Sequence, residues 1–335
     1  AIAFAVAKAR SFTKGDIKKV NVAMNSGMYK NAFTCGIPNS NEVGNVFAAA
    51  LGVVAGNADK GLESLADVTP EDNVKAQEMI DQGKVTVELS GITSRIFIEA
   101  TVETEEDKAI VTIRDSHTNI TKITVNDKVE LETEDEKKTE EDGGEEEAHS
   151  IHKYTLQQLY DYVTTVDIEE IRFINEAYKV NLELFHEGLE NPRTTFARQL
   201  LAINNGKEVS DDEQKTASLM CNAAIEARVI GLDKPAMSIT GSGAHGIIAT
   251  MPLYAAYKVN GYTEEQLLRA TALSYLVCMY IKEYSGRLSA FCGCAIAAGS
   301  GMACALVYLR GGTVEMMAHT LNNMASSIKG FGTLQ

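Results

Sequence analysis

The spacing of apolar residues changes once along the chain, and this change limits the folds that the chain can adopt. From Lys84 to about residue 129, short β-branched segments alternate with polar residues, a period of two that is typical of half-buried strands. From about residue 150 onward, apolar residues recur at helical spacing. We therefore expect an α+β fold, in which a mostly α-helical domain carries a small antiparallel domain as an insertion.

The inserted domain is expected to span residues 70–129. Thr69 caps a helix that has Pro70 in its first turn and ends near Gln82. Four antiparallel strands follow, and their sequences are VTVEL, RIFIEATVE, AIVTIRD and NITKITVN. Residues 1–69 read as a helix, a strand, a polar loop and a helix of small residues. We expect them to join residues 150–335 in the helical domain.

An acidic run separates the two patterns. Residues 130–147 hold eleven Asp and Glu against two Lys, so 11 − 2 = 9 of the fifteen net negative charges lie there. Runs of like charge repel one another and stay solvated. We interpret residues 130–149 as a flexible acidic linker.

Composition excludes several classes of protein. No apolar stretch has the length and purity of a membrane span, and no stripe of Lys and Arg with aromatic residues indicates nucleic-acid binding. The six cysteines are not spaced like a secreted disulfide framework, which favours the reducing cytoplasm. The cysteines are residues 35, 221, 278, 292, 294 and 304. A homodimer is compatible with the sequence.

The helical part contains three sequence patterns that begin helices. The predicted capping boxes pair Asp167 with Glu170, Ser210 with Glu213, and Thr263 with Gln266. The second of these helices should end near Gly231 and the third near Gly286. Two glycine-rich stretches therefore lie at helix ends, a position that suits a ligand site between helices.

The first glycine-rich stretch contains GSGAHG, from Gly241 to Gly246, followed directly by apolar residues that can open a helix. Bare backbone at a helix start can direct several N–H groups at a carboxylate or phosphate, with Ser242 and His245 as side-chain donors. The segment lacks the Lys-Ser/Thr ending of a phosphate-binding P-loop. An oxyanion cradle and a tight turn between helices remain equal alternatives.

The second stretch places Cys292 and Cys294 two residues apart among small side chains. Cys-x-Cys is not a usual zinc pair, and two such residues lie about 200° apart around a helix. One thiolate could be a nucleophile or a cluster ligand, and burial as a small apolar residue is the stronger reading from spacing alone.

Longer motifs add a family resemblance. The segments NAAIEARVIG, MSITGSGAHGI, YIKEYSGRLSAFCGCAIAAGSG and VYLRGG resemble the L-cysteine desulfidase family, a relative of the iron–sulfur L-serine dehydratase alpha chain. AIAFAVAKA, MNSGMYKNAFTCGIPNS and NVFAAALGVVAGN are similar to the N-terminal part of the same family. The resemblance implies a cytoplasmic lyase that converts L-cysteine, or L-serine, to pyruvate and ammonia without pyridoxal phosphate (PLP).

The resemblance also implies a [4Fe–4S] cluster held by three cysteines, with one iron open to the amino-acid substrate. Cys292 or Cys294 would supply one ligand, and we favour Cys292. The family's other two cysteine segments are absent from this sequence. Matching positions give Lys30, Asn31, His245 and Lys282 as candidates for the catalytic base, and Ser242, Gly243, Ala244, His245, Gly246 and Arg287 as substrate-binding residues.

One alternative comes from another functional class. Ala244 stands where the family usually has Asn, and two cluster cysteines are missing, as expected of a non-catalytic relative that binds a small amino or carboxylic acid. The first residues read as part of a helix, so we expect the gene to continue upstream. The full-length gene sequence would separate the two hypotheses.

Overall fold

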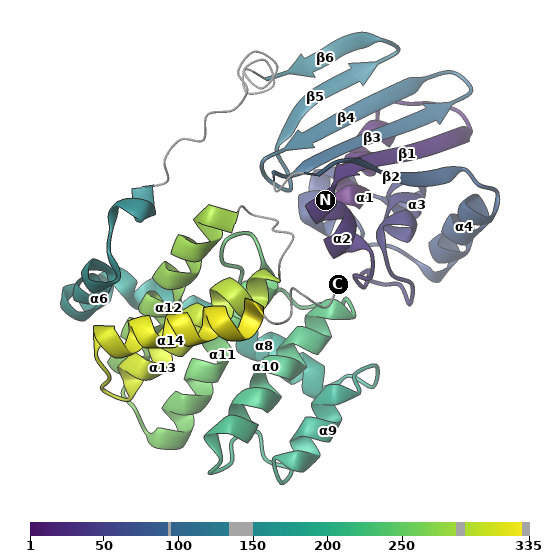
Figure 1. Ribbon diagram of the computed structural model, residues 1–335. Coiled ribbons are helices and arrows are strands. Elements are labelled where there is room, and N and C mark those ends of the chain that lie inside the picture. The colour runs from purple at the N-terminus through teal and green to yellow at the C-terminus, as the bar shows by residue number, and fades with distance from the viewer. Residues whose placement is uncertain (93–94, 134–149, 286–291, 330–335) are drawn as a thin grey trace. The chain divides into compact units, whose positions relative to one another are not determined.

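The computed structural model describes residues 1–92, 95–133, 150–285 and 292–329. It divides into two compact units, residues 1–147 and residues 148–335 (Figure 1). The first contains a β-sheet with helices, and the second is formed by helices. The α+β class predicted from the sequence is confirmed.

A six-stranded sheet forms the first unit, in the order β2-β1-β3-β4-β5-β6. Its strands are β1 (Ile17–Asn25), β2 (Val85–Gly91), β3 (Phe97–Thr104), β4 (Lys108–Arg114), β5 (Ile120–Val125) and β6 (Lys128–Glu132). β1 and β2 are parallel, with Val20 opposite Val85, and every other pair is antiparallel. Val20, Val22 and Met24 of β1 are fully buried, whereas Asn21 between them is not, as the period of two requires.

Small residues allow helices to pack closely on this sheet. The unit contains α1 (Ile2–Arg10), α2 (Ser26–Ala32), α3 (Asn45–Ala55), η1 (Ala58–Glu63) and α4 (Pro70–Asp81). α1 contacts β3 and β4, and also packs against α3. A Cβ on Gly52 of α3 would lie 2.8 Å from the Cα of Ala3, so this crossing needs glycine. The predicted start of α4 is confirmed, with Thr69 and Asp72 forming a reciprocal capping box.

The observed boundaries correct three predictions. β1 lies between β2 and β3, so residues 1–69 belong with the sheet and not with the helical domain. The sheet is consequently mixed and six-stranded, whereas we had expected four antiparallel strands. The acidic run does not start the linker at residue 130, because β6 continues to Glu132 by pairing with β5. The remainder of the predicted linker, residues 134–149, lies outside the described residues.

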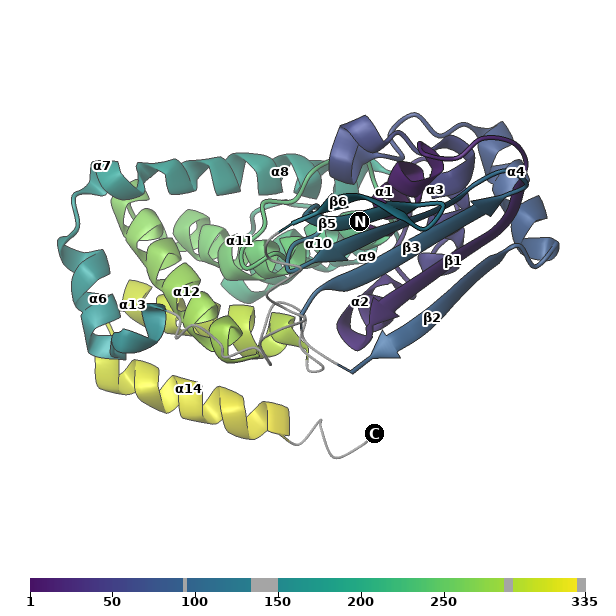
Figure 2. The ribbon, with the colours of Figure 1, turned by 90° about the horizontal axis from the view of Figure 1, so that it is seen from above.

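Ten helical segments make up most of the described part of the second unit, with α11 and α12 at its centre. They are α6 (Leu156–Thr165), α7 (Ile168–Ile171), α8 (Asn175–Glu190), α9 (Phe196–Ile203), α10 (Glu213–Val229), α11 (Gly243–Asn260), α12 (Glu264–Ser285), the π-helix η4 (Cys294–Gly299), α13 (Ser300–Leu309) and α14 (Val314–Lys329). Short 3₁₀ turns, η2 (Ser150–Lys153) and η3 (Arg172–Ile174), precede α6 and α8. α8 and α14 lie on opposite sides of the central pair (Figure 2). None of the helices described is both long and apolar enough to cross a bilayer.

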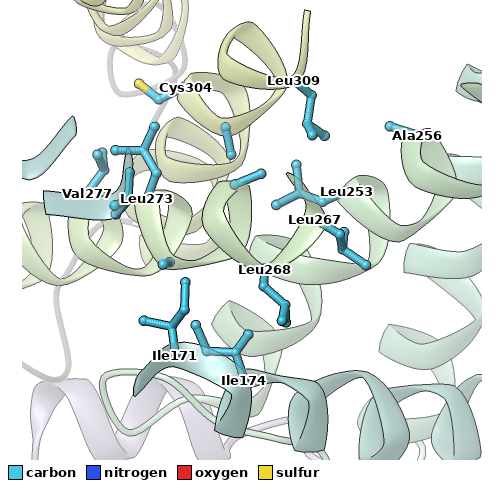
Figure 3. Close-up of a cluster of buried hydrophobic side chains, with 14 of the residues drawn as sticks. Ile171, Ile174, Leu253, Ala256, Leu267, Leu268, Leu273, Val277, Cys304 and Leu309 are labelled. Carbon is cyan, nitrogen blue, oxygen red and sulfur yellow. The ribbon is translucent and has the colours of Figure 1, made fainter. Parts of the chain in front are cut away.

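The core of this unit lies along α12. Leu268 and Leu273 of α12 are fully buried. Leu268 points toward Ile171 and Ile174 of the short α7–η3 segment, whereas Leu273 lies on the other side of α12, toward Cys304 of α13 (Figure 3). Burying each such side chain contributes roughly 1.5–3 kcal/mol. A Cβ on Gly301 of α13 would lie 2.2 Å from the carbonyl oxygen of Ser274, so α13 rests directly on the backbone of α12.

Helix caps follow the sequence predictions in part. Thr263 and Gln266 form the expected box before α12. Asp167 caps α7, but it accepts from the N–H of Glu169. α10 is capped by Asp212 and not by Ser210, whose hydroxyl donates instead to Asn204.

The start of α9 is capped from another helix. The Glu226 carboxylate of α10 accepts three backbone N–H bonds, from Thr195 at 2.7 Å, Phe196 at 3.1 Å and Ala197 at 2.8 Å. This carboxylate satisfies N–H groups of the first turn that have no intrahelical partner.

Candidate functional site

The glycine-rich segment before α11 makes a strained reversal. Thr240 has φ +54° and Gly241 has φ +78°, so two consecutive residues adopt left-handed conformations. The backbones of Ile239 and Ser242 pair on either side of them. The reversal returns the chain to Ser242, whose hydroxyl caps α11 by accepting from the N–H of His245.

Two glycines of this segment are required by close contacts. A Cβ on Gly246 would lie 1.8 Å from the carbonyl oxygen of Met237, which no side chain tolerates. A Cβ on Gly243 would lie 2.8 Å from the Cβ of Ala236 and 3.0 Å from Nε of Arg228. The first turn of α11 is thus pressed against its own preceding segment and against the Arg228 guanidinium at the end of α10.

The backbone N–H groups of the segment divide into two sets. Those of Ser242, His245 and Gly246 donate within the segment. In the part of the second unit that the structure describes, the N–H groups of Gly243 and Ala244 have no hydrogen-bond acceptor. Both belong to the first turn of an eighteen-residue helix, where the dipole favours an anion. The oxyanion-cradle interpretation is therefore kept, because the N–H groups of Gly243 and Ala244 make no hydrogen bond within the segment.

His245 is a buried, neutral imidazole. Its side chain is 4% exposed, and its Nδ1 lies 2.9 Å from the hydroxyl oxygen of Thr240. Burial lowers the pKa of His245 to about 4, and the nearby positive charges of Lys282 and Arg228 act in the same direction. At neutral pH the ring is uncharged, with one nitrogen able to accept a proton.

The Cys-Gly-Cys segment meets His245 directly. A Cβ on Gly293 would lie 2.7 Å from Nε2 of His245 and 3.6 Å from Cδ of Lys282. The Lys282 side chain is 3% exposed, and burial lowers its pKa. The π-helix η4 begins at Cys294, one residue later, and such segments are frequent at functional sites. Three stretches that are far apart in sequence therefore meet at one place.

The two thiols of this segment differ in environment. Cys292 is exposed, whereas Cys294 is half-buried. Burial raises the pKa of the Cys294 thiol to about 11, and the charge and hydrogen bonding of Cys292 add to this effect. Cys292 precedes the helical segment, so the angle of about 200° expected within a helix does not apply, and the two thiols interact with each other. The choice of Cys292 as cluster ligand stays a prediction.

The residues present fit an iron–sulfur cluster only in part. Soft thiols are the ligands that such clusters use, and Cys292 and Cys294 are close together. Within residues 1–92, 95–133, 150–285 and 292–329, however, no three Cys, His, Asp or Glu side chains gather around one point that could hold a metal. The described residues alone do not hold a cluster.

The other predicted site residues belong to the first unit or lie outside the described residues. Lys30 and Asn31 lie on α2 of the first unit, and both are exposed. Arg287 lies outside the described residues. The structure thus brings together Ser242, Gly243, Ala244, His245, Gly246, Lys282, Cys292 and Cys294 within the second unit.

Sequence reasoning missed two residues of this site. Arg228 occurs in the quoted motif NAAIEARVIG, and its place just before the helix end at Gly231 was the available signal. Thr240 precedes the first glycine of GSGAHG, and nothing in the sequence indicates its left-handed backbone.

Comparisons with known proteins agree with the motifs. The model of the family "Serine dehydratase alpha chain" matches residues 59–331. A "UPF0597 protein" of Clostridium botulinum strain Langeland is 39% identical over 331 residues, which cover 98% of this chain and 76% of that protein. Proteins with the same name from Caldanaerobacter subterraneus and Bacteroides fragilis are 35% and 33% identical over the same shares of each chain. No solved structure matches. The chain belongs to the serine dehydratase alpha chain family.

Proposed function

We propose that the protein is a lyase that eliminates hydrogen sulfide from L-cysteine, or water from L-serine. Membership of the serine dehydratase alpha chain family supports a lyase-like function. The observation that favours elimination from a small amino acid is the position of a buried neutral His245 at the anion-attracting start of α11.

The proposed reaction is a β-elimination. A base removes the Cα proton, the electron pair forms the Cα=Cβ double bond, and the Cβ–S or Cβ–O bond breaks. The departing hydrosulfide or hydroxide takes up one proton and leaves 2-aminoacrylate. Its imine tautomer then reacts with water to give pyruvate and ammonia, so that cysteine and one water yield pyruvate, ammonia and hydrogen sulfide.

The start of α11 would bind the substrate carboxylate. The N–H groups of Gly243 and Ala244 supply two donors, and the guanidinium of Arg228 lies against the same turn. An Arg side chain can make two parallel bonds to a carboxylate, which fixes its orientation. Bonds from backbone and Arg together would hold the Cα atom in a defined place.

Among the candidates for the base, His245 fits best. Its ring is neutral at pH 7, whereas an amide such as Asn31 cannot accept a proton at that pH. Lys282 lies beside Gly293 together with Nε2 of His245, and its ammonium would stabilise negative charge that develops on the substrate.

The proposal includes a [4Fe–4S] cluster as cofactor and no PLP. Such a cluster, when bound, supplies an open iron that acts as a Lewis acid on the leaving group. Cys292, or alternatively Cys294, is our candidate for one of its ligands.

The test uses the full-length protein, purified without oxygen and reconstituted with iron and sulfide. Pyruvate and sulfide should form from L-cysteine, and His245→Gln should lower kcat by about 10²-fold or more. Cys292→Ser should lose the cluster absorbance, whereas loss only in Cys294→Ser would reverse our choice of ligand. Binding of L-cysteine or L-serine by calorimetry, without turnover, would favour the non-catalytic alternative.

A further inference from the structure

We propose that Thr240 is a positioning residue, which holds His245 as the tautomer protonated at Nδ1 and leaves Nε2 as the atom that accepts a proton. The inference deepens the proposed function, because it assumes that His245 is the base. The tautomer of His245 is nevertheless a property separate from lyase activity, and it can be observed without any turnover.

The hydrogen bonds of Thr240 assign its single proton. Its hydroxyl oxygen lies 2.7 Å from the carbonyl oxygen of Ile239 and 2.9 Å from Nδ1 of His245. A carbonyl oxygen only accepts, so the shorter contact uses the hydroxyl proton. Nδ1 must then carry a hydrogen and donate it to the Thr240 oxygen.

The other ring nitrogen faces surroundings that favour a lone pair. Nε2 is directed at Gly293, and the Lys282 side chain reaches the same point. The positive charge of Lys282 acts on the His245 ring, so a lone pair on the ring nitrogen beside the Lys282 side chain is favoured over an N–H there. In the part of the chain that the structure describes, Nε2 has no hydrogen-bond acceptor. The surroundings of both ring nitrogens therefore favour the same tautomer, which is protonated at Nδ1.

The backbone of Thr240 is consistent with a role beyond folding. Its φ of +54° lies in the left-handed region, which is a true outlier for a β-branched residue. Such a conformation costs about 1–3 kcal/mol, and Gly or Asn would adopt it more easily. Threonine at position 240 therefore lowers the stability of the fold while it supplies a hydroxyl group. Unfavourable local conformations of this kind are typical of functional sites.

The experiment observes the tautomer directly. The full-length protein is labelled with ¹⁵N in its histidine rings, and long-range correlations from the carbon-bound ring protons report which nitrogen carries hydrogen. His245→Gln identifies the signals by their loss. We expect a protonated Nδ1 in the wild type and in Thr240→Ser, and a mixture of both tautomers in Thr240→Val, which has nearly the same shape but no hydroxyl.

Thr240→Gly is the control for folding, because it removes the hydroxyl and also relieves the backbone. It should be at least as stable as the wild type and still lose the tautomer preference. In the turnover assay, Thr240→Val and Thr240→Gly should lower kcat by about tenfold, with KM nearly unchanged and activity restored in Thr240→Ser.

Wild-type protein protonated at Nε2, or Thr240 variants without the hydroxyl that keep the wild-type tautomer, would overturn the inference. A wild-type Nδ1–H tautomer in a protein without any lyase turnover would support the tautomer assignment and sink the proposed function alone. The two failures are thus distinguishable.

Discussion

Replacement of Gly293 by Ala tests the contact between the Cys-Gly-Cys segment and His245. The new Cβ would lie 2.7 Å from Nε2 and 2.9 Å from Cε1 of the imidazole. Carbon and nitrogen atoms prefer separations of about 3.5 Å, so one side must move by roughly 0.5–1 Å. His245 is only 4% exposed, so the imidazole has little room to move away. Overpacking of this kind costs about 1–3 kcal/mol.

Gly299→Ala is the matched control. A Cβ there would lie 3.4 Å from the carbonyl oxygen of Cys294 and 3.5 Å from Cε of Met324, close to ordinary contact distance. Gly293 and Gly299 both have right-handed helical dihedrals, φ −58° and φ −62°, so Ala gains the same backbone preference at each, about 1 kcal/mol. The difference between the two variants therefore isolates the clash with His245.

Urea unfolding and steady-state turnover measure the two consequences. Gly293→Ala should be less stable than Gly299→Ala by about 1–3 kcal/mol. Displacement of a catalytic group by about 1 Å can cost 10²-fold, so kcat should fall by about 10–100-fold in Gly293→Ala alone. Equal stability and equal kcat in the two variants would refute the contact and the role that we derive from it.

Three further predictions concern the second unit. Glu226→Ala should cost about 2 kcal/mol in urea unfolding, because three N–H groups of α9 lose a charged acceptor. Burial alone would raise the pKa of Glu226, but the backbone hydrogen bonds lower it overall. The loss in free energy of unfolding should therefore be complete above the unfolded pKa of about 4.3 and should shrink as the pH falls further. A loss that does not depend on pH would contradict this. Gly301→Ala should lower the free energy of unfolding by at least about 1–3 kcal/mol, since its Cβ would lie 2.2 Å from the Ser274 carbonyl oxygen, and unchanged stability would refute that packing. Iodoacetamide at pH 8 should modify the exposed Cys292 before Cys294, whose pKa is raised to about 11, and mass spectrometry of the peptides would reveal the reverse order.

Local chemistry was the most predictable part of the fold. The helix at Pro70 and the box at Thr263 and Gln266 were read correctly, because capping involves residues only three apart. Ser210 was misread, since Asp212 offers an equally suitable oxygen two residues later and starts α10 in its place. Several cap residues in succession give a helix boundary, but they do not decide which one is used.

Pairing of distant strands was beyond the sequence. A strand was recognised at the start of the segment from Lys18 to Ser40, yet its neighbours in the sheet start at residues 85 and 97. Alternation of apolar residues determines which face of a strand is buried, but it does not determine the partner. The site shows the same limit: motifs identified GSGAHG and Cys-Gly-Cys, whereas the contacts of His245 with Thr240 and of Gly293 with His245 arise from tertiary packing.

Charge around the start of α11 is opposite to the net charge of the chain, and this helps to weigh the two functional hypotheses. The chain carries −15, but Arg228 and Lys282 both act on His245, and Cys294 is a protonated thiol at neutral pH. A carboxylate would be attracted to this place under either hypothesis, so the cradle alone does not distinguish a binding protein from an enzyme. A binding protein, however, gains nothing from burying a neutral imidazole whose Nε2 lies against Gly293, beside the side chain of Lys282. Burying that polar ring has a cost, and proton transfer during elimination is a use that balances it.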